Sequence, residues 1–437
     1  MPEVLSPEVE CFREFLKIRS VSGEGPSSGS YAQAVAWLQY AQCLRAGLTT
    51  RTLEPVKGKP VLLATWLGKE EHLPALLLNS HYDVVPAMAD CWTVDPWAAE
   101  VKDGRIYGRG TQDMKCVCVQ YLVAIQRLRA KGFVPQRTLH MSFVPDEEIG
   151  GADGMGKLLD SAEFKELGPI ALVLDEGLAS PSNAFTVFYG ERTPWWILVR
   201  ATGPTGHGSR FIKDTAPQKL LRMAERALSF RKAQEEDLGH DAHGCKHGSA
   251  KKLGDVTTVN LTMLRCGVTT DNGETFALNV IPNEAEAGFD VRITPHLKPK
   301  DFSALLDKWC QEEEGITWQF APWTRPLHEH FTTAVDDSNP WWVAFRDIVV
   351  GMGVQVEPEV FPAATDSRFI RQLGIPALGF SPMRNCPILL HEHDEYIPID
   401  VFMSGIDVYV TLIAGLADHP QLPSEVEAVA AKRRKVE

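Results

Sequence analysis

The sequence has little of what marks secreted, membrane-spanning or nucleic-acid-binding proteins. Its nine cysteines are odd in number and irregularly spaced, which fits reduced thiols better than a disulfide framework. Acidic residues outnumber basic ones, and the net charge of -13 argues against nucleic acid as a partner. The first residues lack the segments of a signal peptide, and no apolar run approaches transmembrane length. We therefore expect a cytoplasmic protein that binds neither nucleic acid nor membrane.

Four apolar runs are present, and each leads to side chains that can bind a cation. With 437 residues, of which 44% are hydrophobic, the chain can bury two cores. Continuous apolar runs that alternate with helical stretches predict an α/β fold with a mostly parallel sheet covered on both faces. In such sheets ligands bind beyond the carboxyl ends of the strands, so distant residues converge there. The runs and the residues that follow them are Leu76–Leu78 with His81 and Asp83, Leu139–Val144 with Glu147 and Glu148, Ile170–Leu174 with Asp175, and Pro376–Phe380 with His391.

The spacing of these residues indicates a metal site. His81 and Asp83 are two apart, so in an extended segment they face the same side. Glu147 and Glu148 are adjacent and face opposite sides, so one can bind metal while the other moves protons. Spacing alone leaves open which does which. Asp113 follows a glycine-rich turn and precedes an apolar helix, and one carboxylate can bridge two cations about 3.5 to 4 Å apart. Imidazole and carboxylate ligands together favour zinc, or a similar ion such as cobalt or manganese.

Several ordered motifs resemble those of the co-catalytic zinc amidohydrolases, a superfamily that includes carnosinase, succinyl-diaminopimelate desuccinylase and aminoacylase. The superfamily motifs are His81–Pro86, Gly108–Lys115, Pro145–Gly151 and His391–Glu395. Further segments are most similar to the aminoacylases, and they are Gln112–Val117, Leu174–Gly177, Phe185–Tyr189, Asp337–Trp342, Ala363–Asp366 and Pro376–Met383. The resemblance runs from about Cys11 to Ala414, nearly the whole chain.

The resemblance implies two Zn²⁺ ions per subunit, with Co²⁺ or Mn²⁺ as substitutes. It assigns one ion to His81, Asp113 and Asp175, and the other to Asp113, Glu148 and His391, so that Asp113 bridges. It also selects Glu147 over Glu148 as the general base that takes a proton from water and passes it to the leaving amine. Asp83 would orient its neighbours.

The middle of the chain predicts a second domain inserted into the first. Its strands and helices follow in the order β-α-β-β-α-β, which is typical of a ferredoxin-like fold. We expect a catalytic domain in two parts, residues 1–188 and 326–437, the latter with a short basic tail, and an inserted dimerisation, or lid, domain at residues 189–325.

The resemblance further implies a homodimer with shared active sites. His207 would cross the interface and stabilise the oxyanion of the tetrahedral intermediate, and Asn279 would be supplied across the same interface. Arg292 matches a position that contacts substrate. Thr365 and Arg368 match positions near the reacting carbonyl and the substrate carboxylate, which an arginine binds well through its planar fork. Alternatively, Thr365 caps a helix and Arg368 is an ordinary surface residue.

The predicted function is zinc-dependent hydrolysis of small N-acyl-L-amino acids, most simply N-acetyl ones. A dipeptidase or metallo-carboxypeptidase of the same fold would share the metal chemistry and differ in the groups that flank the scissile amide. A non-catalytic dimeric scaffold or small-molecule binder is the alternative from another class. The histidine-rich stretch 239–254 and the basic residues near the C-terminus are interpreted as a solvated loop and a tail.

Overall fold

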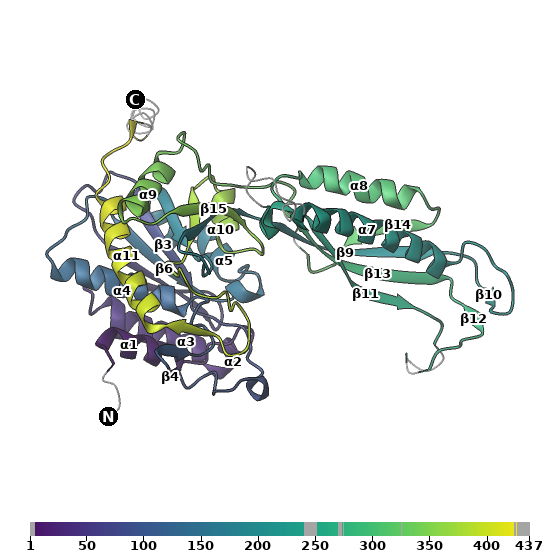
Figure 1. Cartoon of the computed structure of the whole chain (residues 1–437), viewed down its shortest axis with the longest axis horizontal. Coiled ribbons are helices and arrows are strands. Elements are labelled where there is room, and N and C mark those ends of the chain that lie inside the picture. The colour runs from purple at the N-terminus through teal and green to yellow at the C-terminus, as the bar shows by residue number, and fades with distance from the viewer. Residues whose placement is uncertain are drawn as a thin grey trace. The chain divides into compact units, whose positions relative to one another are not determined.

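The computed structural model describes residues 5–239, 251–269, 273, 275–324, 326–423 and 425 (Figure 1). Most of the histidine-rich stretch and all of the basic tail lie outside these residues. The chain forms two compact units. Unit 1 contains Met1–Tyr189, Thr333–Glu359 and Thr365–Glu437, and unit 2 contains Gly190–Thr332 and Val360–Ala364. The expected insert ended at residue 325, and no feature of the sequence indicated that residues 360–364 join unit 2.

Unit 1 is built on an eight-stranded sheet with a parallel centre. Its central strands β6, β3, β7 and β16 run parallel, whereas β1, β2 and β8 pair antiparallel on the flanks. The predicted α/β class with a mostly parallel sheet is confirmed, and the antiparallel flanks are an addition to it. In sheet order the strands are β1 (Thr49–Val56), β2 (Lys59–Trp66), β6 (Leu139–Val144), β3 (Ala75–His81), β7 (Ile170–Asp175), β16 (Ala377–Phe380), β8 (Phe185–Glu191) and β15 (Val356–Phe361).

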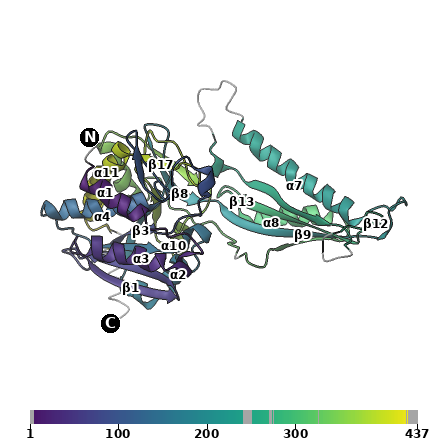
Figure 2. The same cartoon turned by 90° about the horizontal axis from the view of Figure 1, so that it is seen from below.

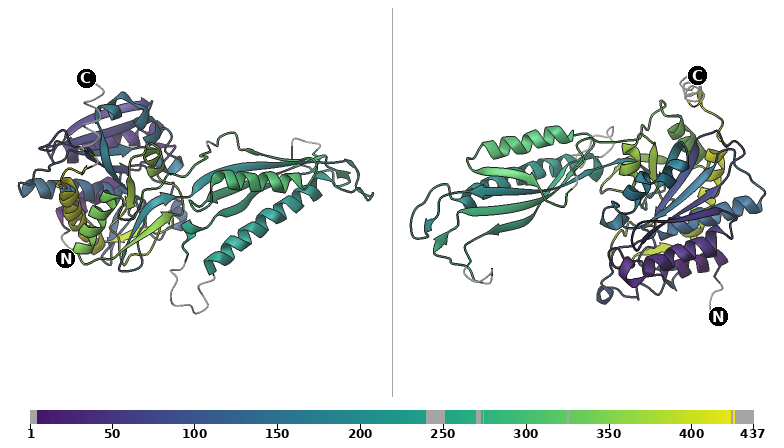
Figure 3. Two further views of the ribbon diagram at one scale, coloured as in Figure 1. Left: turned by 90° about the horizontal axis from the view of Figure 1, so that it is seen from above. Right: turned by 180° about the vertical axis from the view of Figure 1, so that it is seen from behind.

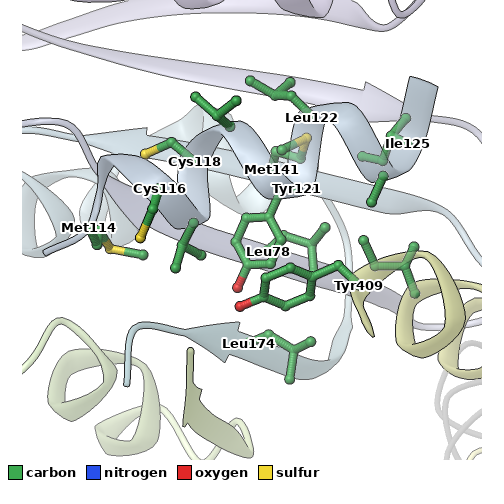
Figure 4. Packing of buried hydrophobic residues seen from close by; sticks show 14 of the residues in the cluster. Leu78, Met114, Cys116, Cys118, Tyr121, Leu122, Ile125, Met141, Leu174 and Tyr409 are labelled. Atoms are coloured by element: carbon green, nitrogen blue, oxygen red, sulfur yellow. The ribbon is translucent and has the colours of Figure 1, made fainter. Parts of the chain in front are cut away.

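Helices cover both faces of this sheet, and alternate residues of the strands pack into a separate core on each face. Leu78 and Leu174 belong to the larger core, and Figure 4 shows them with Met141, Tyr121 and Tyr409. The intervening strand residues enter a smaller core on the opposite face. The helices of the larger core include α1 (Pro7–Leu16), α3 (Ser30–Ala36), α4 (Lys115–Ala130), α9 (Pro340–Gly351) and α11 (Ile399–Ala417), and those of the smaller are α5 (Met155–Asp160), α6 (Ala162–Glu166) and α10 (Ser367–Gln372).

The remaining elements of unit 1 are short. They are the helix α2 (Gly25–Ser28), the π-helix η1 (Trp37–Cys43), the 3₁₀ turns η2 (Ala89–Cys91) and η3 (Glu147–Ile149), and a three-stranded sheet of β17 (Tyr396–Pro398), β5 (Arg105–Tyr107) and β4 (Glu100–Lys102). Every cysteine in the described part of the chain is free.

Helix α11 corrects one statement made from the sequence. Its 19 residues are long and apolar enough to cross a membrane by length and composition, contrary to the expectation that no run approaches that length. The helix packs against α4 and α9, and Phe402, Ile406, Tyr409 and Leu412 along it are fully buried. Burial inside unit 1 accounts for this face of the helix, and 44% of its apolar window is buried in all.

Unit 2 has the predicted ferredoxin-like arrangement. Its four-stranded antiparallel sheet has the order β11-β13-β9-β14. Side chains from both long helices and from one face of the sheet form a single core, and Figures 2 and 3 show the helices running along the sheet. The elements are β9 (Thr193–Thr202), β10 (Gly206–His207), α7 (Ala216–Gly239), η5 (Leu253–Asp255), β11 (Thr258–Cys266), β12 (Val280–Ile281), β13 (Glu284–Ile293), α8 (Pro299–Gln311) and β14 (Ile316–Phe320).

Candidate active site

Three neighbouring parallel strands of unit 1 end at the predicted site. β3 ends at His81, β6 leads into the η3 turn with Glu147 and Glu148, and Glu176 directly follows β7. The pairing of His81 with Val144 brings the ends of β3 and β6 together. The sheet thus gathers these side chains at one edge, as its predicted topology requires.

Asp113 lies between two imidazoles. Its Oδ1 is 3.0 Å from His81 Nε2 and its Oδ2 is 3.2 Å from His391 Nε2. Burial opposes ionisation of this carboxyl, but the hydrogen bonds from His391 and His81 hold its pKa below the usual range. Two histidines from distant parts of the chain therefore face opposite oxygens of one carboxylate, which is the arrangement that a bridging ligand needs.

Glu148 shares His391 with Asp113. Its Oε2 lies 2.9 Å from His391 Nε2. Burial, followed by the charge of Asp113, raises the pKa of Glu148 to about 7. Glu148, Asp113 and His391 thus meet as the resemblance implied.

The structure corrects the predicted ligand Asp175. The carboxylate that lies against His81 belongs to the next residue, Glu176, whose Oε2 is 3.5 Å from His81 Nε2. Asp175 instead accepts hydrogen bonds from Asn79 Nδ2 at 2.9 Å and from Ser367 Oγ at 2.6 Å. Both of its oxygens are engaged within the fold, so the carboxylates that lie against His81 Nε2 are those of Asp113 and Glu176.

The sequence predicts Asp175 because this residue directly follows the apolar run Ile170–Leu174, and the resemblance assigned it to one ion. Asp175 is the last residue of β7, whereas Glu176 lies just beyond the strand. The available signal was a second acidic pair directly after a buried strand, analogous to Glu147 and Glu148.

Glu147 is a buried carboxylate of this group. It is 8% exposed, and burial together with the charge of Glu176 raises its pKa well above the usual value. One set of mutually close ligand atoms comes from His81, Glu147 and Glu176, and another from His81, Asp113 and Glu148, with all atoms of a set within 4.8 Å of one another. Since these carboxylates raise one another's pKa, cations placed among them would offset their repulsion, and the imidazole and carboxylate donors suit zinc or a similar ion.

Asp83 holds the turn that carries both glutamates. Its Oδ1 accepts the amide of Glu147 at 3.2 Å and its Oδ2 accepts the amide of Glu148 at 3.3 Å. Its Oδ1 also lies 3.4 Å from His81 Nδ1. Asp83 is fully buried and lies on the side of the extended segment that His81 faces, as the spacing predicted.

Glu395 performs a similar task for the loop before Asp113. Its carboxylate accepts hydrogen bonds from four groups of that loop, namely Arg109 Nη1 at 2.7 Å, the amide of Gly110 at 3.1 Å, Thr111 Oγ1 at 3.2 Å and the amide of Gln112 at 2.7 Å. In the sequence Glu395 is only the last residue of the motif His391–Glu395, and the structure gives it a positioning role.

Thr365 and Arg368 lie beside the η3 turn. Thr365 is buried, and its Oγ1 accepts the amide of Ser367 at 3.3 Å, so it supports the start of α10, although Asp366 is the N-cap. The Arg368 guanidinium donates to the carbonyls of Thr365 and Gly150, both at 2.7 Å. Arg368 is thus anchored to the turn after Glu148, and its contact with substrate stays a prediction.

The other predicted residues lie in unit 2. His207 is exposed, and its Nδ1 is 2.8 Å from Ser209 Oγ. It pairs with Val280 of β12, next to Asn279, whose carbonyl accepts the amide of Gly208 at 2.7 Å. Arg292 donates to both oxygens of Asp290, at 2.7 and 3.0 Å. His207 and Asn279 are therefore neighbours, whereas Arg292 lies on β13, in the other sheet of the unit.

The family model described as peptidase family M20/M25/M40 matches residues 77–415. The chain belongs to this family. Curated relatives named Aminoacylase-1 are 47% identical over 412 residues in Dictyostelium discoideum (94% of this chain, 97% of the relative), 46% over 421 residues in Sus scrofa (96% and 97%) and 44% over 427 residues in Homo sapiens (97% and 98%). The predicted resemblance is confirmed, and the M20 chain is a metal-dependent hydrolase.

Solved structures of the M20 family have the same fold at low sequence identity. An M20 metallo-carboxypeptidase from Sulfolobus solfataricus superposes with a TM-score of 0.68 at 19% identity and covers 94% of this chain and 100% of its own. Human carnosine dipeptidase 1 gives 0.63 at 16% identity (94% and 97%). A Bacillus subtilis M20 protein described as a dinuclear metal-binding peptidase gives 0.60 at 15% identity (94% and 96%).

Proposed function

We propose that this M20 hydrolase cleaves N-acyl-L-amino acids, with N-acetyl amino acids as the simplest substrates, and that it does so in the cytoplasm with two zinc ions per subunit. The observation that carries the proposal is the Asp113 carboxylate, which lies between His81 and His391, with Glu147 close to the same His81. The identity of 44% to 47% to aminoacylases supports the choice of substrate class.

The ligand sets follow from the side chains that share an imidazole. Asp113 and Glu176 both face His81 Nε2, so these three would hold one ion. Asp113 and Glu148 both face His391 Nε2, so these three would hold the other. When bound, the two ions supply Lewis-acid polarisation of the amide carbonyl and lower the pKa of the attacking water.

Glu147 is the proposed general base. Its neighbour Glu148 is committed to His391, which leaves Glu147 to take a proton from the attacking water and deliver it to the nitrogen of the leaving amino acid. In the absence of metal, burial and the charge of Glu176 raise the pKa of Glu147 well above its usual value.

Two of the remaining roles, those of His207 and Asn279, are proposed to be filled from a second subunit. His207 is an exposed donor, and we propose that it stabilises the oxyanion in the partner's site, with Asn279 beside it. Phe211 and Leu278 near this strand pair are exposed to 107% and 94%, which suits a surface that another subunit covers. Thr365 and Arg368 would bind the carbonyl and carboxylate ends of the substrate, and Arg292 would contact the substrate from unit 2.

The first test is acetate release from N-acetyl-L-methionine by the zinc-loaded protein. The wild type should turn over, and Glu147→Gln should lose most of its activity while it keeps two zinc ions per chain. Simple dipeptides offered in parallel test the peptidase alternative. Turnover of dipeptides alone would refute the aminoacylase proposal, and failure of all substrates with a loaded protein would favour a binding role.

Shared active sites can be tested with two inactive variants. Glu147→Gln and His207→Ala are each expected to be inactive as homodimers. When they are co-expressed, half of the dimers are mixed and each mixed dimer has one intact site, so about a quarter of the wild-type activity should return. No recovery, despite mixed dimers detected by mass spectrometry, would contradict a His207 supplied by the partner.

A further inference from the structure

We propose that Ser22 is a positioning residue for catalysis, because its hydroxyl fixes the Asp83 carboxylate that holds Glu147 and Glu148. This inference rests on the proposed function, in which those two glutamates are base and ligand. Ser22 Oγ donates to Asp83 Oδ2 at 2.6 Å, and both side chains are buried. Such a short hydrogen bond to an ionised carboxylate is among the stronger types in proteins.

The backbone holds the Ser22 hydroxyl in place. Residues 20–22 run beside residues 82–84 as a short extended pair, in which Val84 donates to the carbonyl of Ser20 and Ser22 donates to the carbonyl of Val84, both at 3.0 Å. Val21 and Val84 form a parallel bridge. The segment that follows α1 is therefore docked against the end of β3, and Ser22 cannot move away from Asp83 without breaking these bonds.

The Asp83 carboxylate has a separate task for each oxygen. Oδ1 accepts the amide of Glu147 and lies near His81, whereas Oδ2 accepts the amide of Glu148 and the Ser22 hydroxyl. Both amide contacts are long, at 3.2 and 3.3 Å, so the short bond from Ser22 is the strongest restraint on rotation of the carboxylate. If that bond is lost, the carboxylate can turn, and the turn that carries both glutamates loses its fixed support.

Ser20 provides a matched control. It is also fully buried, two residues earlier in the same extended segment, and its Oγ donates to a backbone carbonyl, that of Tyr82, at 2.6 Å. Ser20→Ala therefore removes a hydrogen bond of the same length from the same docked segment but leaves the Asp83 carboxylate untouched.

The experiment compares Ser22→Ala, Ser22→Cys and Ser20→Ala with the wild type. Zinc affinity is measured without substrate by competition with a chromophoric chelator, and kcat and KM for N-acetyl-L-methionine are measured per zinc-loaded chain. Substitution of a residue that supports a metal ligand typically costs about 10- to 100-fold in affinity or activity. We expect Ser22→Ala to lower kcat by about 10-fold with KM within about twofold, and to weaken zinc binding.

Ser22→Cys keeps the shape and a weak donor, so it should fall between wild type and Ser22→Ala. Ser20→Ala should lower the unfolding midpoint as much as Ser22→Ala does but leave kcat within about twofold. The proposal is overturned if Ser22→Ala keeps wild-type kcat and zinc affinity, or if Ser20→Ala loses as much of both. If the wild type itself does not turn over, the proposed function fails, and the zinc titration still decides whether Ser22 supports the site.

Discussion

Glu176→Gln and Asp175→Asn change adjacent residues, and only Glu176→Gln should weaken metal binding strongly. Glu176 faces His81 Nε2 at 3.5 Å, alongside Asp113, so the glutamine removes an anionic ligand from one of the two ions. Asp175 faces Asn79 and Ser367. An asparagine there can still accept from Asn79 and can donate to the Ser367 hydroxyl, which is able to accept.

The structure sets the expected size of each effect. A change in a residue that only supports a ligand costs about 10- to 100-fold in affinity, so loss of the Glu176 ligand itself should exceed about 100-fold, or about 3 kcal/mol, at one site. Asp175→Asn keeps the shape and both hydrogen-bonding neighbours of the side chain. Its effect should therefore stay within about 10-fold, near the lower end of that range.

Zinc titration of the metal-free variants separates the two outcomes. Glu176→Gln should bind one zinc ion tightly and one weakly, whereas Asp175→Asn should bind both tightly. Circular dichroism at each step verifies that both variants are folded. The reasoning is refuted if Asp175→Asn loses a tight ion while Glu176→Gln retains both.

Three further predictions concern stability. Burial lowers the pKa of His140 to about 4, so the stability that this group contributes is present above about pH 6.5 and is lost as pH falls. In the wild type this effect should make the unfolding free energy, measured with urea, about 2 kcal/mol lower at pH 5 than at pH 7. His140→Gln should remove that part of the difference. Arg137 is fully buried and its Nη2 lies 2.8 Å from Glu425 Oε2. Glu425→Ala should therefore lower the unfolding free energy by about 3 kcal/mol in the same assay. An unchanged urea midpoint would show that the contacts of Arg137 with backbone carbonyls are enough to stabilise its buried charge. Without metal the pKa of Glu148 is about 7, above its unfolded value, so the stability that this group contributes is present below about pH 4.5 and is lost as pH rises. The unfolding free energy of the chelated protein should therefore fall by up to about 3 kcal/mol between pH 5 and pH 7.5. An equally large fall in the zinc-loaded protein would contradict this cause.

The sheet and most of the site could be predicted because both follow from buried strands. The apolar runs became β3, β6, β7 and β16 with ends that differ by at most three residues, and the parallel topology placed His81 and Glu147 at one edge. The antiparallel flanking strands were not predicted, since they do not end at polar residues of the site. The 19-residue apolar stretch of α11 was not predicted, because Asp400 and Asp407 divide it into shorter uncharged runs.

The wrong metal ligand and the missed supporting residues have different physical origins. An apolar run shows where a strand ends but not which of two adjacent acidic residues faces the site, and Glu176 lies one residue past the end of β7. Ser22 and Glu395 were missed as supports for another reason. Each acts through contacts with residues 61 or more positions away in the chain, and no local pattern reveals such contacts.

The site gathers carboxylates where burial opposes their charge, and the rest of unit 1 is arranged to hold them there. Glu147, Glu148 and Glu176 all have raised pKa values, so the side chains themselves would favour separation or protonation. Hydrogen bonds from other segments counter this tendency: the N-terminal segment fixes Asp83 through Ser22, and Glu395 fixes the loop that precedes Asp113. Because these supports come from opposite ends of the sequence, the site depends on the complete unit 1 fold, and cations would supply the positive charge that the cluster of carboxylates requires.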